Sequence, residues 1–163
     1  MIAVSNASPL INIACLNIFQ HLPALYEKVI LPDAVFSEVV KKGRGRKGAK
    51  EVLNGIAAGF IDRERVSNEL AVSALSEFIG DGESEAIILA SEIFADAIIL
   101  DDNKARNIAH SMNLNVIGTI GILLAMKERY IIKEIRPYLD KAVSYGFRIS
   151  PHLFIKVLEK AGE

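Results

Sequence analysis

The fold of this chain is decided by residues 97–106, which read AIILDDNKAR. Their four apolar residues are typical of a buried strand, and two carboxylates, Asp101 and Asp102, follow where the strand ends. In open α/β sheets, ligands bind in the crevice beyond the carboxyl ends of the strands. Adjacent carboxylates at such a place repel each other unless a cation or hydrogen-bond donors compensate. Alternatively, these two residues only cap a helix that begins near Asn103.

The composition indicates one domain without a membrane segment. The chain has 163 residues, and 51% of them are hydrophobic, which supplies a substantial core. No apolar run approaches the ~20 residues that a membrane helix needs. Residues 1–5 lack the basic region of a secretory signal, so we expect a soluble, cytoplasmic protein.

Cysteine and histidine are too few to suggest a metal site of their own. The single cysteine, Cys15, excludes an internal disulfide, and three scattered histidines do not have the spacing of a zinc site. Any metal would therefore need oxygen ligands, which favours Mg²⁺ or Mn²⁺. The net charge of −1 gives no global basic field, so any contact with nucleic acid must be local.

Strands alternate with helices along the whole chain. Strands are expected at 2–5, 28–31, 97–100 and 115–117, with a further edge strand at 60–66, and helices at 9–16, 18–25, 32–42, 67–78, 83–94, 103–112, 120–127, 131–145 and 151–160, besides one that ends near Gly59. This pattern predicts a single α/β domain over residues 1–163, with a central parallel sheet covered on both faces. The short β–α turns then place their polar groups on the same edge of the sheet.

A second informative acid is Glu83, at the start of a clear helix. At 100° per residue it shares a stripe with Ala86 and Ile87, which predicts a carboxylate on the core side of the first turn. Such a carboxylate needs compensation, partly from the helix N-terminus and partly from a cation. Alternatively, Asp81, Glu83 and Glu85 only complement the helix dipole.

The third candidate is Glu38, between Val35 and Val39 on the helix that follows the second strand. An exposed helical glutamate is its ordinary interpretation. If the acids converge at the carboxyl edge of the sheet, they would bind one or two divalent ions, generate hydroxide from water and stabilise an in-line displacement at phosphorus. That ring would consist of Glu38, Glu83, Asp101 and Asp102, with Asn6 and Thr119 beside them.

An ordered set of short motifs resembles the PIN-domain family, and most closely its prokaryotic branch related to the toxins of toxin–antitoxin pairs. The resemblance implies a three-layer α/β/α ribonuclease that cuts RNA with Mg²⁺ or Mn²⁺ held by three or four acids. It implies catalytic, metal-binding roles for Glu38, Glu83, Asp101 and Asp102, a further ligand in Asn6, and support from Glu85, Thr119, Ser8 and Arg106. The motifs are Ser5-Asn6-Ala7-Ser8-Pro9-Leu10-Ile11, Leu31-Pro32 with Val35 and Glu38-Val39, Gly82-Glu83-x-Glu85-Ala86-Ile87, Leu100-Asp101-Asp102-x-x-Ala105-Arg106, and Gly118-Thr119-x-Gly121.

One departure from the family pattern concerns Asn6, because the typical family has aspartate at this place. An amide oxygen can ligate a metal, but it brings no charge and cannot accept a proton. Each lost carboxylate weakens a site for a hard cation and raises the pKa of the water that the site must activate. The alternative to an active nuclease is therefore a catalytically weak or inactive PIN-like module that binds RNA or a protein partner.

A basic segment offers a local contact for RNA. Between Lys41 and Lys50 the chain has six basic residues and no acid, and its glycines let it follow an irregular strand. The alternative is a solvated loop. Arg106 lies one turn past the acid pair, where it can contact a phosphate or, as the favoured alternative, form an ion pair with Asp102. The predicted RNA-binding residues are Lys41, Lys42, Arg44, Arg46 and Lys47.

The last two expected helices carry apolar stripes that predict core packing. Any surplus apolar face would provide a surface for a homodimer or for an antitoxin protein, since a helix in a groove is a common mode of partner binding. A third class of function, a phosphoacceptor signalling domain, also uses an adjacent Asp pair. It fits poorly, because such domains place the pair after the first strand, where this chain has Ser5-Asn6.

Overall fold

A five-stranded parallel sheet forms the centre of the computed structural model, which describes residues 1–163. The strand order is β3-β2-β1-β4-β5, and every neighbouring pair is parallel. The expected α/β class with a parallel sheet between helical layers is therefore confirmed. The strands are β1 (Ile2–Ser5), β2 (Lys28–Pro32), β3 (Ile61–Glu64), β4 (Ala97–Ile99) and β5 (Val116–Ile117).

Helices connect the strands and continue beyond the last one. Of the two irregular segments, η1 is a 3₁₀-helix and η2 is a π-helical turn that prolongs α2. The helical elements are α1 (Ala7–Cys15), η1 (Phe19–Ala24), α2 (Asp33–Phe36), η2 (Ser37–Lys42), α3 (Ala49–Ala57), α4 (Glu69–Ser76), α5 (Asp81–Glu92), α6 (Asn103–Ser111), α7 (Thr119–Glu128), α8 (Arg136–Ser144) and α9 (Pro151–Ala161).

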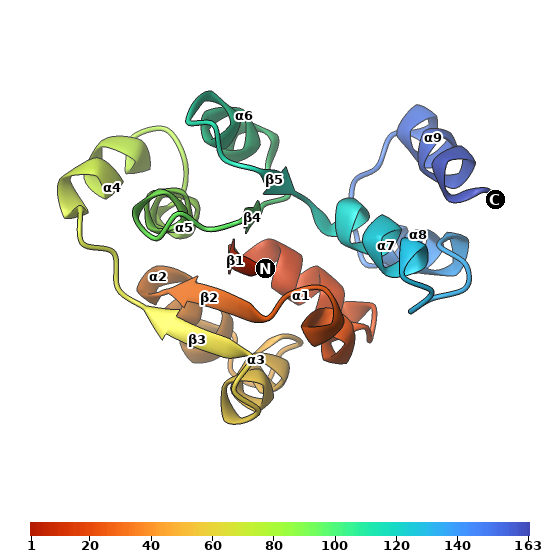
Figure 1. Ribbon diagram of the computed structural model, residues 1–163, viewed down its shortest axis with the longest axis horizontal. Coiled ribbons are helices and arrows are strands. Elements are labelled where there is room, and N and C mark those ends of the chain that lie inside the picture. Colours follow the sequence, from red (N-terminus) through yellow and green to blue (C-terminus); the bar gives the residue numbers. More distant parts are fainter.

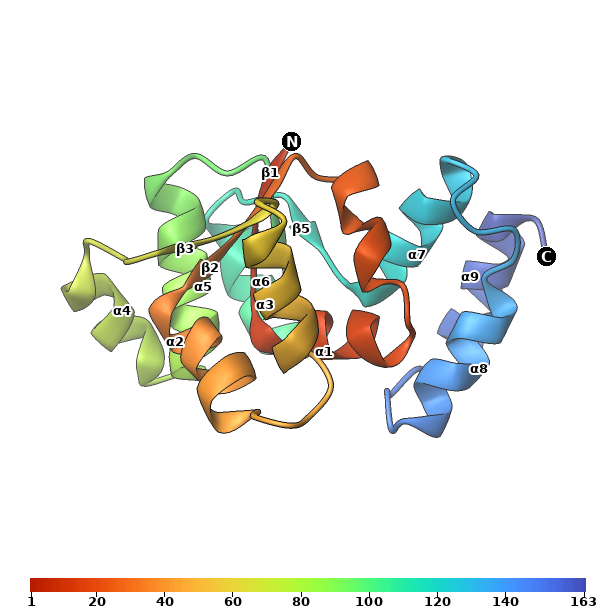
Figure 2. The ribbon, with the colours of Figure 1, turned by 90° about the horizontal axis from the view of Figure 1, so that it is seen from below.

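Two hydrophobic clusters occupy the two faces of the sheet. Figure 1 shows α4, α5 and α6 on one side of the strands, and α1, α3 and α7 on the other. The cluster on the α1 side contains 28 buried residues and extends to α8 and α9, which lie beyond α7 in both views (Figures 1 and 2). The cluster on the α5 side contains 12. Consecutive residues of β1 enter different clusters. Ala3 belongs to the larger cluster and Val4 to the smaller one, as expected of a strand that is buried on both faces.

The helix α5 is buried more completely than its sequence pattern predicted. Instead of one apolar stripe, Ser84 and every residue from Ala86 to Ala90 are buried. The reason is that α5 packs on the sheet and is also in contact with α2, α4 and α6. Glu83 itself is half-buried at the first turn, next to buried Gly82.

The helix expected over 131–145 is shorter, which is a correction to the sequence prediction. It begins only at Arg136 because Pro137 lacks an N–H and is tolerated in the first turn but not in a helix interior. The segment before it is irregular, although Ile132 and Ile135 are buried in the core. The helix expected over 18–25 is the 3₁₀ segment η1, with Pro23 inside it.

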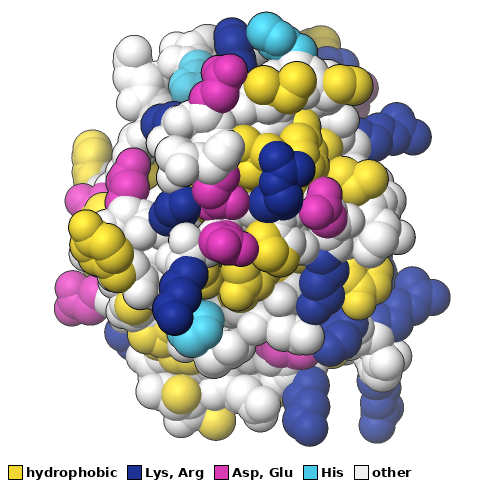
Figure 3. All heavy atoms as spheres, turned by 90° about the vertical axis from the view of Figure 1, so that its right-hand side faces the viewer, with side chains coloured by type: hydrophobic (Ala, Val, Ile, Leu, Met, Phe, Trp, Pro, Cys, Tyr) yellow, Lys and Arg dark blue, Asp and Glu magenta, His cyan; other side chains and the backbone are white.

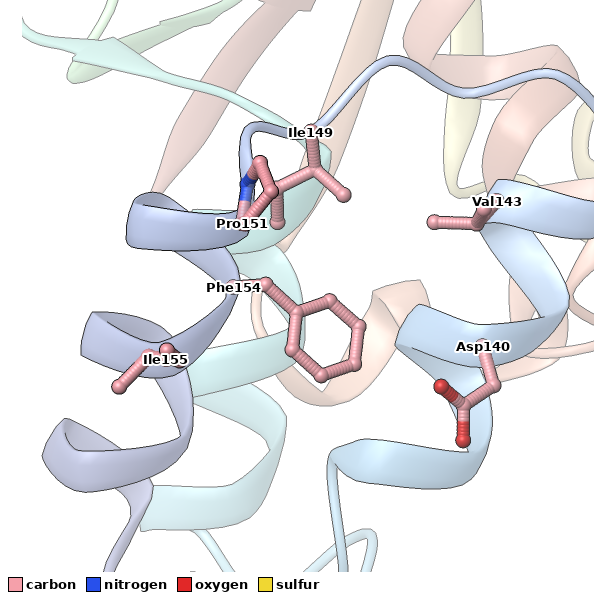
Figure 4. A pocket seen from close by; sticks show the side chains of 6 residues that line it. All are labelled: Asp140, Val143, Ile149, Pro151, Phe154 and Ile155. Carbon is pink, nitrogen blue, oxygen red and sulfur yellow. The ribbon is translucent and has the colours of Figure 1, made fainter.

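The last two helices bury only part of their apolar stripes. Leu139, Val157 and Leu158 are buried, but Val143 and Ile155 are about half exposed, at 47% and 57%. An apolar groove of about 410 Å³ lies between α8 and α9, and the Phe154 ring points into it (Figure 4). The face of the molecule that α7, α8 and α9 form shows hydrophobic patches with Lys and Arg between them (Figure 3). None of the helices has the length and apolarity needed to cross a membrane.

Candidate active site

The carboxyl edge of β1, β4 and β5 brings three of the predicted site residues to neighbouring positions. In the register of the sheet, Ser5 pairs with Ile99, and Ile99 pairs with Ile117. Asn6 directly follows β1, and Asp101 and Thr119 are the second residues after β4 and β5, as the β–α turns predicted. The Asn6 N–H donates to the Ile99 carbonyl at 3.1 Å, which ties the first two strand ends together.

Asn6 lies at the centre of the first group of polar side chains. It is 2% exposed, and its Nδ2 donates to Glu83 Oε1 at 2.8 Å. Its Oδ1 is buried and has no hydrogen-bond partner. Glu38 Oε2 lies on the same side, because a Cβ placed on Gly82 would be 3.1 Å from Asn6 Oδ1 and 3.2 Å from Glu38 Oε2. Asn6 and Glu38 therefore both face Gly82, and the Asn6 amide links them to Glu83.

Local features of the chain explain how Glu38 reaches this group. It lies in η2, the π-helical turn that continues α2, and π turns are frequent at functional sites. Much of the side chain is exposed, but its carboxyl end lies over Gly82. Partial burial, and then the negative charge of Glu83, raise the pKa of Glu38, while Lys42 acts in the opposite direction. The two carboxylates are therefore close enough to repel each other.

Asp101 belongs to a second group, in which hydrogen bonds satisfy both of its oxygens. The Thr119 N–H donates to Oδ1 at 2.7 Å, and Thr119 Oγ1 donates to Oδ2 at 2.6 Å. Asn12 Nδ2 also donates to Oδ2, at 2.9 Å. Thr119 thus contacts the acid beside which the sequence placed it. Asn12 was missed, and the available signal was a polar residue inside an otherwise apolar helix.

The two groups do not merge into the ring of acids that the sequence predicted. No three Asp, Glu, His or Cys side chains lie together closely enough to hold a metal ion. The first group nevertheless offers two carboxylates and the unpartnered amide oxygen of Asn6. Mg²⁺ is commonly held by one or two carboxylates while it keeps several waters. The donors at Asn6, Glu38 and Glu83 therefore fit a hard divalent ion, whereas Asp101 has both oxygens engaged.

Asp102 and Arg106 are arranged differently from the predicted ion pair. Asp102 is exposed, and its Oδ1 accepts from the Ala105 N–H at 2.9 Å, so it caps α6 as the alternative interpretation proposed. Arg106 Nη1 donates to the Leu100 carbonyl at 2.8 Å, and the four ion pairs of the chain do not include it. The expected Asp102–Arg106 ion pair is therefore wrong, because each group has a backbone partner closer to hand.

Two further predicted residues have different surroundings. Glu85 Oε2 accepts from the Ala34 N–H at 2.8 Å, so this side chain on α5 holds the first turn of α2. One turn further along that helical segment lies Glu38, which gives Glu85 a positioning role. Ser8 is exposed in the first turn of α1, on the chain that leaves Asn6.

The basic segment lies next to the first group. All five predicted RNA-binding residues are exposed. Three of them (Lys42, Arg46 and Lys47) line a cleft of about 370 Å³ together with Glu38. The segment therefore places positive charge beside one of the candidate metal ligands.

Comparison with known proteins adds one finding. The family model DUF3368, described as a PIN domain, matches residues 2–163. No curated protein and no solved structure matches the chain. The matched residues include the whole sheet, both groups of polar side chains and the basic segment.

Proposed function

The chain belongs to the PIN-domain family, and from this premise we propose that it is a metal-dependent endoribonuclease. The observation that carries the proposal is the buried, unpartnered Oδ1 of Asn6, which faces Gly82 as Glu38 Oε2 does, while the Nδ2 of the same amide binds Glu83. A buried polar atom without a partner costs free energy, and a cation would remove that cost. The same cation would relieve the repulsion between the two glutamates.

The proposed ion is Mg²⁺ or Mn²⁺, held by Asn6, Glu38 and Glu83. When bound, such an ion activates water and stabilises the charge that develops on a phosphodiester. Asn6 orients Glu83 through its amide N–H.

Asp101 has a different part in this proposal. Thr119 and Asn12 hold its carboxylate at the end of β4, at the same edge of the sheet as Asn6. There its carboxylate would serve as a further hydrogen-bond acceptor at the edge where the ion is proposed. Asp102 stabilises the start of α6 and so keeps Asp101 in place.

The experiment is RNA cleavage with purified protein, Mn²⁺ and a mixture of structured and single-stranded RNAs. Glu83→Gln and Asp101→Asn are expected to reduce cleavage by at least about a hundredfold, the lower end of what removing an acid–base group costs. Glu77→Gln serves as the matched control, because Glu77 is exposed at the end of α4. Equal cleavage by all four proteins would show that these acids do not carry the reaction.

The finer assignment is that the chain is the toxin of a toxin–antitoxin pair. It is supported by the motif resemblance and by the apolar groove between α8 and α9, which offers a surface to a helix of an antitoxin. Expression in a bacterial host is expected to arrest growth, and Glu83→Gln is expected to abolish the arrest. Sedimentation of the free protein would show whether the groove is instead covered by a second copy in a homodimer.

The second candidate function is a silent PIN-like module that binds RNA without cutting it. The observations that favour it are the missing charge at Asn6 and the hydrogen bonds that already engage both oxygens of Asp101. Calorimetry with Mn²⁺ separates the two candidates, because a silent module would bind RNA but have negligible affinity for the metal. Cleavage that appears only in Asn6→Asp would also favour the silent module.

A further inference from the structure

A polar cleft of about 510 Å³ lies beside Asp101 and is distinct from the Asn6 group. One wall comes from the ends of β4 and β5 and the first turn of α6. The other wall comes from the connection between α8 and α9 and from the first turn of α9. Its ten lining residues are Asp101, Asn103, Arg106, Gly118, Ile120, Gly121, Phe147, Arg148, Ser150 and Leu153.

The charged groups of the cleft favour an anion. Asp101 is the one acid among the lining residues, against Arg106 and Arg148. Hydrogen bonds from Thr119 and Asn12 already engage both Asp101 oxygens. These bonds reduce the attraction of the Asp101 carboxylate for a nearby cation. The four ion pairs of the chain include neither arginine, so both guanidinium groups retain N–H donors for a ligand.

Arg106 is held in position at the cleft. Its Nη1 donates to the Leu100 carbonyl at 2.8 Å, so the guanidinium is fixed near the end of β4. Gly118 makes this possible, because a Cβ there would lie 2.9 Å from Arg106 Nη1 and 3.0 Å from Asp101 Oδ1. A fixed guanidinium loses less conformational entropy on binding a phosphate than a free one.

The remaining lining residues include apolar side chains suited to a base. Ile120, Phe147 and Leu153 line the cleft, and Phe147 and Ile120 also pack against the larger core. Arg148 follows Phe147 directly and is exposed. An aromatic ring held by the core, next to an exposed arginine, is the combination that single-stranded nucleic acid uses, with the base on the ring and the phosphate on the cation.

We propose that this cleft binds one nucleotide of a single-stranded RNA. The nucleotide lies next to the phosphodiester that is cleaved at the acid site, which is the group of Asn6, Glu38 and Glu83. Arg148 and Arg106 bind its phosphate, and Phe147 contacts its base. The proposal rests on the proposed nuclease function, because the bound nucleotide would belong to the RNA strand that the nuclease cleaves. It makes Arg148 a binding residue that lies outside every motif of the resemblance.

The experiment measures binding separately from cleavage. The full chain with Glu83→Gln, in EDTA, is titrated into a fluorescein-labelled 12-nucleotide single-stranded RNA at several salt concentrations. Adding Arg148→Ala is expected to weaken binding about tenfold and to reduce the salt slope by about 0.7, the value for one phosphate contact on a single strand. Arg148→Lys is expected to restore most of the salt slope. Phe147→Leu is expected to weaken binding without changing the salt slope.

Lys133→Ala is the matched control, because Lys133 is exposed, carries the same charge and does not line the cleft. Equal affinities for the Arg148→Ala and Lys133→Ala proteins would overturn the proposal, as would equally tight binding of a duplex of the same length. The nuclease function fails in a different way, through absence of Mn²⁺-dependent cleavage by the wild-type chain. Loss of affinity in Arg148→Ala would then still stand as evidence for the cleft.

Discussion

Gly82 shows how one missing atom shapes the acid site. It is buried in the first turn of α5, where most residues would favour the helix more than glycine does. A Cβ at this position would approach Asn6 Oδ1 and Glu38 Oε2 more closely than side chains normally do. Glycine therefore leaves space beside the oxygens of both residues, which the proposed ion would occupy.

Gly82→Ala is expected to weaken Mn²⁺ binding about tenfold, as displacement of ligand-orienting groups does. The helix gains propensity from alanine, so the melting temperature in EDTA is expected to change little. Calorimetry and thermal melts check both parts. An unchanged affinity for Mn²⁺ would mean that Asn6 and Glu38 do not share an ion.

Asn6→Asp tests the charge that this chain lacks. The substitution removes the N–H that Asn6 donates to Glu83 and places a third carboxylate beside two others. In EDTA the melting temperature is expected to fall by about 6 °C or more, because an unpaired buried charge costs about 3 kcal/mol or more.

With Mn²⁺ the Asn6→Asp protein is expected to gain more stability than the wild type, since it offers a stronger site for a hard cation. The measurement is the rise in melting temperature at saturating Mn²⁺ for both proteins. A smaller rise in Asn6→Asp than in wild type would contradict the proposed ion at this residue.

At the scale of elements, the order of strands and helices followed from the sequence because it depends on local patterns. The apolar runs before Asn6 and Asp101 predicted β1 and β4, and both polar turns lie at the predicted edge. The hydrogen-bond partners of Asp101 were harder to predict from the sequence. Asn12 is 89 positions away in the sequence, and only the packing of α1 against the end of β4 brings the two together.

Local sequence patterns also could not decide the roles of Asp102 and Glu85. A carboxylate at a helix start can serve as a cap or as a metal ligand, and spacing alone does not distinguish these roles. For Asp102 the structure shows a cap on α6, and for Glu85 a bond to the start of α2. Both roles were decided by which backbone N–H group lay within reach.

Glu85 therefore supports a prediction about how α5 positions α2. Glu85→Ala removes the acceptor of the Ala34 N–H, which is worth roughly 1.5 kcal/mol for a charged partner and corresponds to a fall in melting temperature of about 3–6 °C. Because α2 leads into the turn that carries Glu38, the affinity for Mn²⁺ is expected to fall as well. Glu77→Ala is the control, and Glu85→Gln is expected to recover most of the loss because it keeps an acceptor oxygen.

At the scale of the whole molecule, the last residue fastens three C-terminal elements together. Glu163 accepts a bond from Lys127 Nζ on α7 and from the N–H groups of Ile135 and Arg136 at the start of α8. Burial opposes ionisation of Glu163, but these three donors outweigh it and lower its pKa to about 2. The carboxylate thus joins α7, α8 and the end of α9.

This arrangement predicts a dependence of stability on pH. Because the folded pKa of Glu163 lies below its ordinary value of 4.5, its contribution is complete above that value and is lost as the pH falls toward 2. Glu163→Gln is expected to lower the melting temperature by about 2 °C at pH 6, since an exposed ion pair contributes at most about 1 kcal/mol. Thermal melts of both proteins at pH 6 and near pH 2 check this, and a difference that does not shrink in acid would contradict it.

The exposure of the helix α4 has a consequence for local unfolding of the molecule. None of its residues is buried, and Glu92 on α5 accepts from the Ser67 and Asn68 N–H groups at its entrance. Its apolar residues Ala71, Val72 and Leu75 pack against the smaller cluster only partly buried, so its amide hydrogens should exchange with solvent through local fluctuations that leave β1, β4 and the acid site intact. A protease that cuts the chain at α4 would thus leave the carboxyl edge of the sheet assembled.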